Sequence, residues 1–386
     1  MKVLLVHNRY ACAGGEDTVF EYENCLLRGN GISTDRFEVS NTELKTSSLA
    51  TRIGLGLNTV WSIRGNRRIS DSIEHFRPDI AHFHNTFPQL SPSVYYACAR
   101  AGVPVVQTLH NYRLLCAAGI FLRDGAVCTD CAGGAFYHAV KHRCYRNSRA
   151  ASAAVVAMQY VHHYMGTYRT KVDRYIALTE FARQRFIEAG LPAERIVVKP
   201  NFVTDPAPGG KGLDGERHGA LYVGRLSQEK GIDCLLEAWR EIDYPLTIIG
   251  EGPMQEELPR LPQVRFLGWQ DPETVAEWMR RSAFLTMPSV WYEGFPMVIL
   301  EAYANGLPVL ASRLGSLAEI VHDRQTGLHF NPGDARDLVR AVQEATGGGL
   351  DLAAAGRRAR REYLDRYTPE RNIEQLLQIY RGLVHA

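Results

Sequence analysis

The stretch that most constrains the fold is Ser-Val-Trp-Tyr-Glu-Gly-Phe-Pro-Met-Val-Ile-Leu-Glu-Ala, at residues 289–302. It follows the apolar run Ala283–Pro288, so a buried strand is predicted to end where a helix begins. Pro296 suits a first helical position, and Gly294 lets the backbone approach a bound group closely. The unpaired N–H groups of such a helix start favour phosphate. The sequence therefore predicts an anion site formed by Gly294, Phe295, Pro296, Met297 and Val298.

Two carboxylates flank this helix start. Glu293 precedes it, and Glu301 lies about one and a half turns inside it. Carboxylates beside a phosphate site are useful when the ligand also carries hydroxyl groups, and a nucleotide sugar has hydroxyls on both sides of its diphosphate. The alternative is a loop glutamate and a surface glutamate on an ordinary α/β helix.

A basic segment upstream favours the interpretation that Glu293 and Glu301 bind a ligand with both phosphate and hydroxyl groups. Gly-Arg-Leu-Ser-Gln-Glu-Lys-Gly at residues 224–231 follows the predicted strand Ala220–Val223. It places Arg225 and Lys230 at another junction of strand, loop and helix, on the edge of the sheet where ligands bind. Two cations near an anion-binding helix start predict a diphosphate clamp.

Taken together, Glu293-x7-Glu301 and the Gly-Arg-Leu-x-x-Glu-Lys-Gly segment resemble the retaining Glu-x7-Glu glycosyltransferases of GT-B fold. This family is also called glycosyltransferase family 4-like, or glycosyl transferases group 1, and the resemblance covers almost the whole chain. It implies an α/β fold of two doubly wound Rossmann-like domains that face a cleft.

The resemblance also implies an activity. A hexosyltransferase-type enzyme would move a sugar from a UDP- or GDP-sugar to the hydroxyl of a sugar or lipid-linked sugar, with retention of the anomeric configuration. Such enzymes serve glycan, exopolysaccharide or glycolipid biosynthesis. Because the sequence has no Asp-x-Asp motif for a catalytic divalent ion, no cofactor is expected for catalysis.

Residue roles follow from the same resemblance. His110, at the end of the predicted strand Pro104–His110, would lie over the donor sugar and the reaction centre. Arg225 and Lys230 would stabilise the departing diphosphate, Glu293 would bind sugar hydroxyls, and Glu301 would bind the ribose. Six further donor-binding positions are expected: Gly14, Gly15, Asn201, Gly224, Gly252 and Gly268.

The Gly14–Gly15 pair has a second interpretation. It lacks the Gly-x-Gly-x-x-Gly pattern and the acidic partner of a dinucleotide site, which argues against a dehydrogenase. As a plain turn after the first strand it would look the same as a ligand-binding loop.

The 386 residues suit two domains of ordinary size. We expect a first domain over residues 1–203 that carries a cysteine-rich insertion at 113–148. A nucleotide-sugar-binding domain is expected over 204–365, and a helix over 366–386 that crosses back to the first domain. The breaker cluster Pro206–Gly210 predicts the linker.

Four cysteines share one segment with the spacing C-x11-C-x2-C-x12-C: Cys116, Cys128, Cys131 and Cys144. Cysteines spaced in this way bind metal more often than they form disulfides in a cytosolic protein. Four thiolates would suit a closed, structural zinc site that holds the insertion together. A single Cys-x2-Cys motif with long flanking spacings indicates a metal site less strongly than two paired Cys-x2-Cys motifs do. Four metal-free cysteines therefore remain the alternative.

Charge is distributed unevenly along the chain. Residues 1–200 hold 24 Lys and Arg against 16 Asp and Glu, a net charge of +8, and the remainder has a net charge of −6. Helical basic segments at 45–77 and 138–174 interleave arginines with apolar and aromatic residues, which suits an anionic lipid surface or an ordinary solvated helix. We expect a cytoplasmic protein with peripheral contact at the inner membrane face, and no nucleic-acid partner because no such motif is present.

Two rival functions are compatible with this fold. A non-hydrolysing nucleotide-sugar epimerase would consume the donor without an acceptor, but the Glu-x7-Glu pair argues against it. A non-catalytic nucleotide-sugar-binding protein would not need His110, Arg225, Lys230 and Glu293 together.

Overall fold

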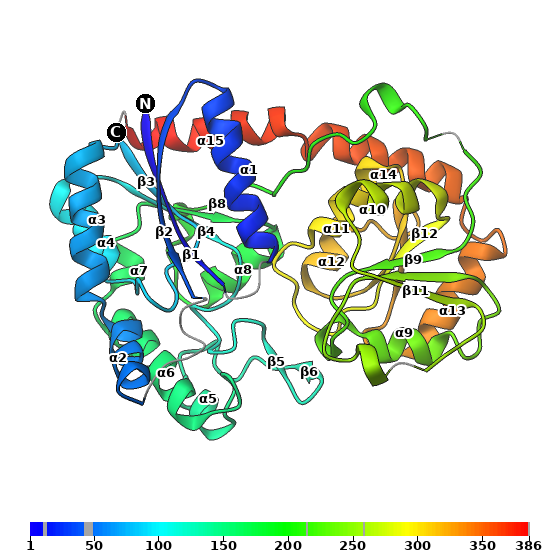
Figure 1. Cartoon of the computed structure of the whole chain (residues 1–386), viewed down its shortest axis with the longest axis horizontal. Helices are drawn as coiled ribbons and strands as arrows, with labels where there is room; N and C mark the ends of the chain where they lie inside the picture. Colours follow the sequence, from blue (N-terminus) through cyan, green and yellow to red (C-terminus); the bar gives the residue numbers. More distant parts are fainter. Residues whose placement is uncertain (11–13, 42–48, 214, 258, 385–386) are drawn as a thin grey trace. The chain divides into compact units, whose positions relative to one another are not determined.

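The computed structural model describes residues 1–10, 14–41, 49–213, 215–257 and 259–384 (Figure 1). Contacts within the chain group these residues into two compact units. The first unit comprises Met1–Phe121, Cys128–Pro200 and Ile373–Ala386, and the second comprises Leu122–Val127 and Asn201–Asn372. The observed division at residue 200 lies three residues before the expected end of the first domain.

The first unit is built on a parallel sheet with the strand order β2-β1-β3-β4-β7-β8. Its strands are β1 (Lys2–Arg9), β2 (Ser33–Ser40), β3 (Ile80–Phe83), β4 (Val105–Leu109), β7 (Arg174–Ala177) and β8 (Ile196–Val198). The central strands are apolar and buried on both faces, which is the pattern that parallel sheets require.

Helices connect these strands, as parallel pairing demands. They are α1 (Gly15–Gly29), α2 (Leu49–Val60), α3 (Ile63–Phe76), α4 (Val94–Ala101), α5 (Tyr137–Lys141), α6 (Arg149–Tyr164), α7 (Thr167–Thr170) and α8 (Glu180–Glu188). Where it is described, the expected helical segment 45–77 consists of two helices, because Ser62 caps α3 by accepting from the Gly65 N–H at 3.1 Å. Residues 45–48 lie outside the described residues.

The last helix of the chain completes the core of the first unit. Helix α15 (Pro369–Val384) contributes Ile373, Leu376 and Tyr380 to a buried cluster that also holds Val3 and Leu5 of β1. Side chains from opposite ends of the chain therefore form one hydrophobic core.

A long segment between β4 and β7 carries the cysteines. It contains α5, α6 and a short antiparallel hairpin of β5 (Leu122–Arg123) and β6 (Ala126–Val127). Phe136, Val155 and Cys131 of this segment share a buried cluster with Phe87, which precedes it, and α6 packs against α2.

The second unit has a parallel sheet with the order β11-β10-β9-β12-β13-β14. Its strands are β9 (Ala220–Val223), β10 (Leu246–Ile249), β11 (Val264–Gly268), β12 (Phe284–Met287), β13 (Val309–Ser312) and β14 (Gly327–Phe330). Numbered within the unit this order is 3-2-1-4-5-6, the doubly wound arrangement of Rossmann folds. Ligands of such sheets bind at the carboxyl ends of the strands, where the order reverses.

Helices cover both faces of this second sheet. They are α9 (Ile232–Ala238), α10 (Pro272–Arg281), α11 (Met297–Ala304), α12 (Gly315–Ile320), α13 (Ala335–Thr346) and α14 (Leu352–Arg366). Tyr222 of β9 packs with α9 and α13 in one buried cluster, and the next residue back, Leu221, packs with α11 and α14 in another. Two six-stranded parallel sheets with such helices confirm the predicted α/β, doubly wound fold class.

Candidate functional site

Lys230 and Glu293 meet at the carboxyl edge of the second sheet. The Lys230 Nζ donates to Glu293 Oε1 at 2.7 Å, although the two residues are 63 positions apart. Lys230 ends a short 3₁₀ turn after β9, and Glu293 lies in the loop after β12. Because β9 and β12 are neighbours in the sheet, the fold brings the two predicted catalytic residues together.

Glu293 is held by three donors. Besides Lys230, the Ser289 Oγ donates to Glu293 Oε1 at 2.7 Å and the Trp291 Nε1 donates to it at 3.1 Å. Glu293 is 4% exposed. Since the contacts described for this carboxylate all reach Oε1, the second oxygen, Oε2, is left to accept from a ligand hydroxyl.

Lys230 is fixed from a second side. Its ammonium lies 5.3 Å from the centre of the Trp291 ring, within cation–π range. The following residue, Gly231, has φ +71°, and a Cβ there would lie 1.9 Å from the Pro288 carbonyl oxygen. Sequence reasoning missed Ser289, Trp291 and Gly231 as supports, although all three belong to the segments that it singled out.

The predicted anion-binding helix is present, with one change at its start. Helix α11 begins at Met297, and Pro296 is its N-cap rather than its first helical residue. The Ile299 N–H already donates to the Pro296 carbonyl at 3.1 Å. Glu301 is half-buried on this helix, and burial raises the pKa of its carboxyl group.

The glycine loops of the second unit pack against one another. The Gly224 N–H donates to the Ile249 carbonyl at 3.0 Å, and the Gly250 N–H donates to the Gly268 carbonyl at 2.8 Å. A Cβ on Gly252 would lie 2.2 Å from the Leu226 carbonyl oxygen. Close backbone contact therefore explains why position 252 requires a glycine, and no bound ligand is needed for that explanation.

Arg225 lies on the same loop and is exposed. Its carbonyl accepts from the Tyr222 hydroxyl at 2.8 Å, which orients the backbone. Within the described part of the chain its guanidinium makes no hydrogen bond or ion pair, so it is available to an anion.

In the first unit, Gly14 and Gly15 are exposed at the start of α1. The Gly14 N–H donates to Asp17 Oδ2 at 2.8 Å, and Asp17 Oδ1 lies 2.8 Å from the His7 Nε2. Asn201, the first residue of the second unit's long segment, is buried, and its Oδ1 has no hydrogen-bond partner among the described residues.

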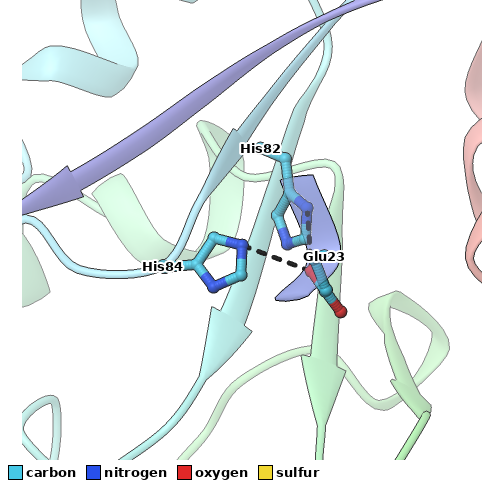
Figure 2. A group of neighbouring side chains, drawn as sticks. All are labelled: Glu23, His82 and His84. Atoms are coloured by element: carbon cyan, nitrogen blue, oxygen red, sulfur yellow. Dashed lines mark ion pairs between the residues drawn. The ribbon is translucent and has the colours of Figure 1, made fainter. Parts of the chain in front are cut away.

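His110 is partly exposed and adjoins two buried histidines, His82 and His84, that lie around Glu23. His110 Nε2 lies 3.0 Å from His84 Nδ1, and His84 Nε2 lies 3.3 Å from Glu23 Oε2. Figure 2 shows His82 and His84 of the same sheet edge turned toward the Glu23 carboxylate of α1. His82 and His84 lie on the same side of the strand, since residues two apart share a face, and the centres of their rings lie 4.5 Å apart.

A buried ion pair anchors this cluster. The Lys199 Nζ donates to Glu23 Oε1 at 2.6 Å, and both side chains are 1% exposed. Burial alone would raise the pKa of Glu23, but the neighbouring Lys199 and His84 hold this pKa well below its usual range. Burial and the neighbouring His84 lower the pKa values of His82 and His110 well below the ordinary value, so both rings are neutral.

Glu23, His82 and His84 place three potential metal-ligand atoms within 4.8 Å of one another. The surroundings do not suit a cation. Lys199 already neutralises Glu23, and both ring nitrogens of His82 are engaged, by the Tyr380 hydroxyl at 2.7 Å and the Thr108 hydroxyl at 2.8 Å. Only His84 Nε2 and Glu23 Oε2, which have no hydrogen-bond partner among the described residues, are left over, and two atoms are too few for a metal site.

The four cysteines lie in the first unit and interact electrostatically. Burial, followed by the proximity of Cys116, Cys144 and Cys128, raises the pKa of the Cys131 thiol to about 12. Among the described residues, no three of these sulfur atoms lie within 4.8 Å of one another. The cysteines are gathered, but not at the spacing of a formed metal site.

Comparison with known proteins follows the same division of the chain. Residues 9–201 match the family model "Glycosyl transferase 4-like domain", and residues 217–346 match "Glycosyl transferases group 1". An uncharacterized glycosyltransferase of Methanocaldococcus jannaschii is 34% identical over 137 residues, which are 34% of this chain and 39% of that protein. Glycogen synthase of Mycobacterium tuberculosis is 38% identical over 152 residues, 36% of each chain.

Among solved structures, Anabaena HepE aligns over 99% of this chain and 100% of its own, with a TM-score of 0.67 and 17% identity. The fold is thus that of the GT-B proteins. The chain belongs to the group 1 glycosyltransferases, with the 4-like domain model on its first half and the group 1 model on its second.

Proposed function

We propose that this protein transfers a sugar from a nucleoside diphosphate-sugar to the hydroxyl group of a sugar or lipid-linked sugar, with retention at the anomeric carbon and without a metal ion. The observation that carries the proposal is the Lys230–Glu293 contact of 2.7 Å beside the start of α11. It puts a cation and a carboxylate beside helix N–H groups at one sheet edge, which supports a site for a ligand with both phosphate and hydroxyl groups.

The chemistry follows from this arrangement. The bond between the anomeric carbon and the diphosphate oxygen breaks, and its electron pair stays on the diphosphate. Lys230, exposed Arg225 and the N–H groups at the start of α11 would stabilise that developing charge, as preorganised donors do. The acceptor oxygen bonds to the anomeric carbon from the same face, and its proton passes to the departing diphosphate.

Glu293 would have two tasks. Its Oε1 accepts from Lys230 and holds that ammonium, while Oε2 would accept from a hydroxyl of the donor sugar. Glu301, farther along α11, would accept from the ribose. Within these steps the residues supply the charge stabilisation that a divalent ion supplies in other transferases.

Nucleotide titration without divalent metal tests the proposal. We expect UDP or GDP to bind with micromolar affinity by calorimetry. Anabaena HepE was solved with UDP and with UDP-glucose, so UDP is the first choice. Donor consumption without an acceptor would indicate an epimerase, and a folded protein that binds no nucleotide diphosphate would contradict the proposal.

The partner surface is part of the same proposal. Leu57 of α2 and Tyr164 of α6 are 68% and 81% exposed, and α2 and α6 pack together (Figure 1). Exposed Lys141, Arg143 and Arg149 lie at the end of α5, in the turn after it and at the start of α6. Exposed apolar and basic side chains on one helical segment suit an anionic membrane, where a lipid-linked acceptor would lie.

Vesicle sedimentation tests this surface. We expect binding to vesicles that contain an anionic lipid, with loss of binding in a Leu57→Ser, Tyr164→Ser variant. Equal binding of both proteins would remove this surface from the proposal. In the described part of the chain, no helix is both long and apolar enough to span a bilayer.

The four cysteines are proposed to hold a structural zinc ion. Zn–S bonds of about 2.3 Å set tetrahedral sulfurs about 3.8 Å apart, so binding would draw the thiols closer than the described positions. Metal analysis of protein purified without added metal should give about one zinc per chain, reduced in Cys131→Ser. A folded wild-type protein without zinc would end this part of the proposal.

A further inference from the structure

His84 lies between a buried carboxylate and the predicted catalytic histidine. Its Nε2 is 3.3 Å from Glu23 Oε2, and its Nδ1 is 3.0 Å from His110 Nε2. The rings of His84 and His110 stack with their centres 5.1 Å apart. These contacts connect α1, β3 and the end of β4 through three side chains.

The donor and acceptor roles along this chain of contacts are restricted. Ionised Glu23 can only accept a hydrogen bond, and the Lys199 ammonium keeps it ionised. With a single proton on the His84 ring, that proton is favoured on Nε2, because this nitrogen lies 3.3 Å from the ionised Glu23 Oε2, a charge contact rather than a hydrogen bond. Its Nδ1 then carries a lone pair and accepts from His110 Nε2–H.

We propose that Glu23 and His84 are positioning residues that hold His110 in the tautomer with a proton on Nε2 and a lone pair on Nδ1. His110 then offers a hydrogen-bond acceptor, not a donor, to a hydroxyl group of a bound sugar. The catalytic use of this nitrogen rests on the proposed function, whereas the tautomer itself does not.

A purely structural role for the cluster is the competing explanation. Stacking and burial would hold the His110 ring in place with either tautomer, and a nitrogen-free ring at position 84 would serve equally well. The two explanations therefore differ in which nitrogen of His110 carries the proton.

Nitrogen NMR of histidine-labelled protein decides between them. The His110 ring resonances are assigned by their loss in His110→Asn. We expect protonated Nε2 and bare Nδ1 in the wild-type protein, and a mixture of tautomers in His84→Phe, which keeps a stacking ring. In His82→Gln, the matched control from the same strand, His110 should keep the wild-type tautomer.

Two NMR outcomes would overturn the proposal: a proton on His110 Nδ1 in the wild-type protein, or the same tautomer in the wild type and in a folded His84→Phe. If His84→Phe does not fold, His84→Gln is the replacement. It leaves the Lys199–Glu23 pair in place, and its amide can still donate to Glu23 and accept from His110, so His110 should keep its proton on Nε2. A proton on His110 Nδ1 in this variant would overturn the proposal.

Kinetics test the consequence separately. For His84→Phe we expect kcat to fall roughly 10- to 100-fold, as for other residues that orient a functional histidine, with nucleotide affinity unchanged. Unchanged kcat with a changed tautomer would refute the catalytic use of Nδ1. If the wild-type protein binds no nucleotide, the proposed function fails, while the NMR result still judges the tautomer.

Discussion

At the scale of single residues, the chemistry depends on pairs that the fold assembles. Lys230 and Glu293 were found in the sequence as separate members of two motifs, and the structure adds that each orients the other. Glu23 and Lys199 were not found at all. They are 176 positions apart and carry no motif, so only the packing of α1 beside β8 reveals them.

Removal of the Lys230 ammonium should disable transfer without unfolding the protein. Lys230→Ala loses one charge-assisted contact to the leaving group, and we expect kcat to fall about 100- to 1000-fold, roughly 3–4 kcal/mol. Lys211→Ala, at an exposed lysine of the same unit, is the control in steady-state assays. Full activity in Lys230→Ala would contradict the proposed role of Lys230 in binding the diphosphate.

The histidine cluster predicts sensitivity to acid. His82 and His110 have pKa values well below the ordinary 6.5, so below about pH 6.5 the unfolded chain binds more protons than the folded one and stability falls. The pKa of Glu23 is also depressed, so its contribution is present above about pH 4.5 and is lost as the pH falls further.

Melting temperatures measured from pH 7.5 to pH 4 check this. We expect a steady fall below pH 6.5, with a shallower slope in His82→Gln. His75→Gln, at an exposed histidine of α3, should keep the wild-type slope. A wild-type curve that is flat down to pH 5 would show that these rings are not buried in the neutral form.

At the scale of elements, the sequence predicted whether a segment is a helix or a strand better than it predicted where each helix begins and ends. Alternating apolar runs and turns indicated the parallel strands, because each run is buried on both faces. The division of 45–77 into α2 and α3 was not predicted, since it depends on Ser62, whose N–H also donates to Ser91 Oγ at 2.9 Å from another segment. Such a capping site is visible only once distant residues are in contact.

The loops of the second sheet give an element-scale prediction. A methyl group at Gly252 would collide with the Leu226 carbonyl, so Gly252→Ala should destabilise the protein by about 1–3 kcal/mol. Gly215→Ala, where a Cβ meets nothing within 4 Å, is the control in thermal melts. Equal stability of the two variants would mean that the loop after β10 relaxes freely.

At the scale of the whole molecule, the end of the chain packs with its beginning, although the second unit lies between them in the sequence. The first unit is closed by residues that follow the second unit in sequence, and Ile373, Leu376 and Tyr380 are at most 8% exposed in its core. A returning helix was expected from the resemblance, but which core positions it would fill could not be read from its amphipathic pattern alone.

Separate production of the two segments tests this division. A chain of residues 1–200 lacks the α15 side chains and should be unstable, whereas residues 201–372 should fold and bind nucleotide. Circular dichroism and limited proteolysis, with the full chain as reference, report both results. A stable 1–200 fragment would show that α15 adds little to the first core.

Protein synthesis gives the position of Tyr380 a further consequence. Its hydroxyl is bonded to His82, so the histidine cluster cannot be complete while the ribosome is still translating residues 201–372. At about 5–20 residues per second that interval lasts roughly 10–35 s. During it, the apolar side chains of Val3 and Leu5 lack the α15 residues that cover them in the folded protein, and a nascent chain with such uncovered apolar surface is prone to aggregate.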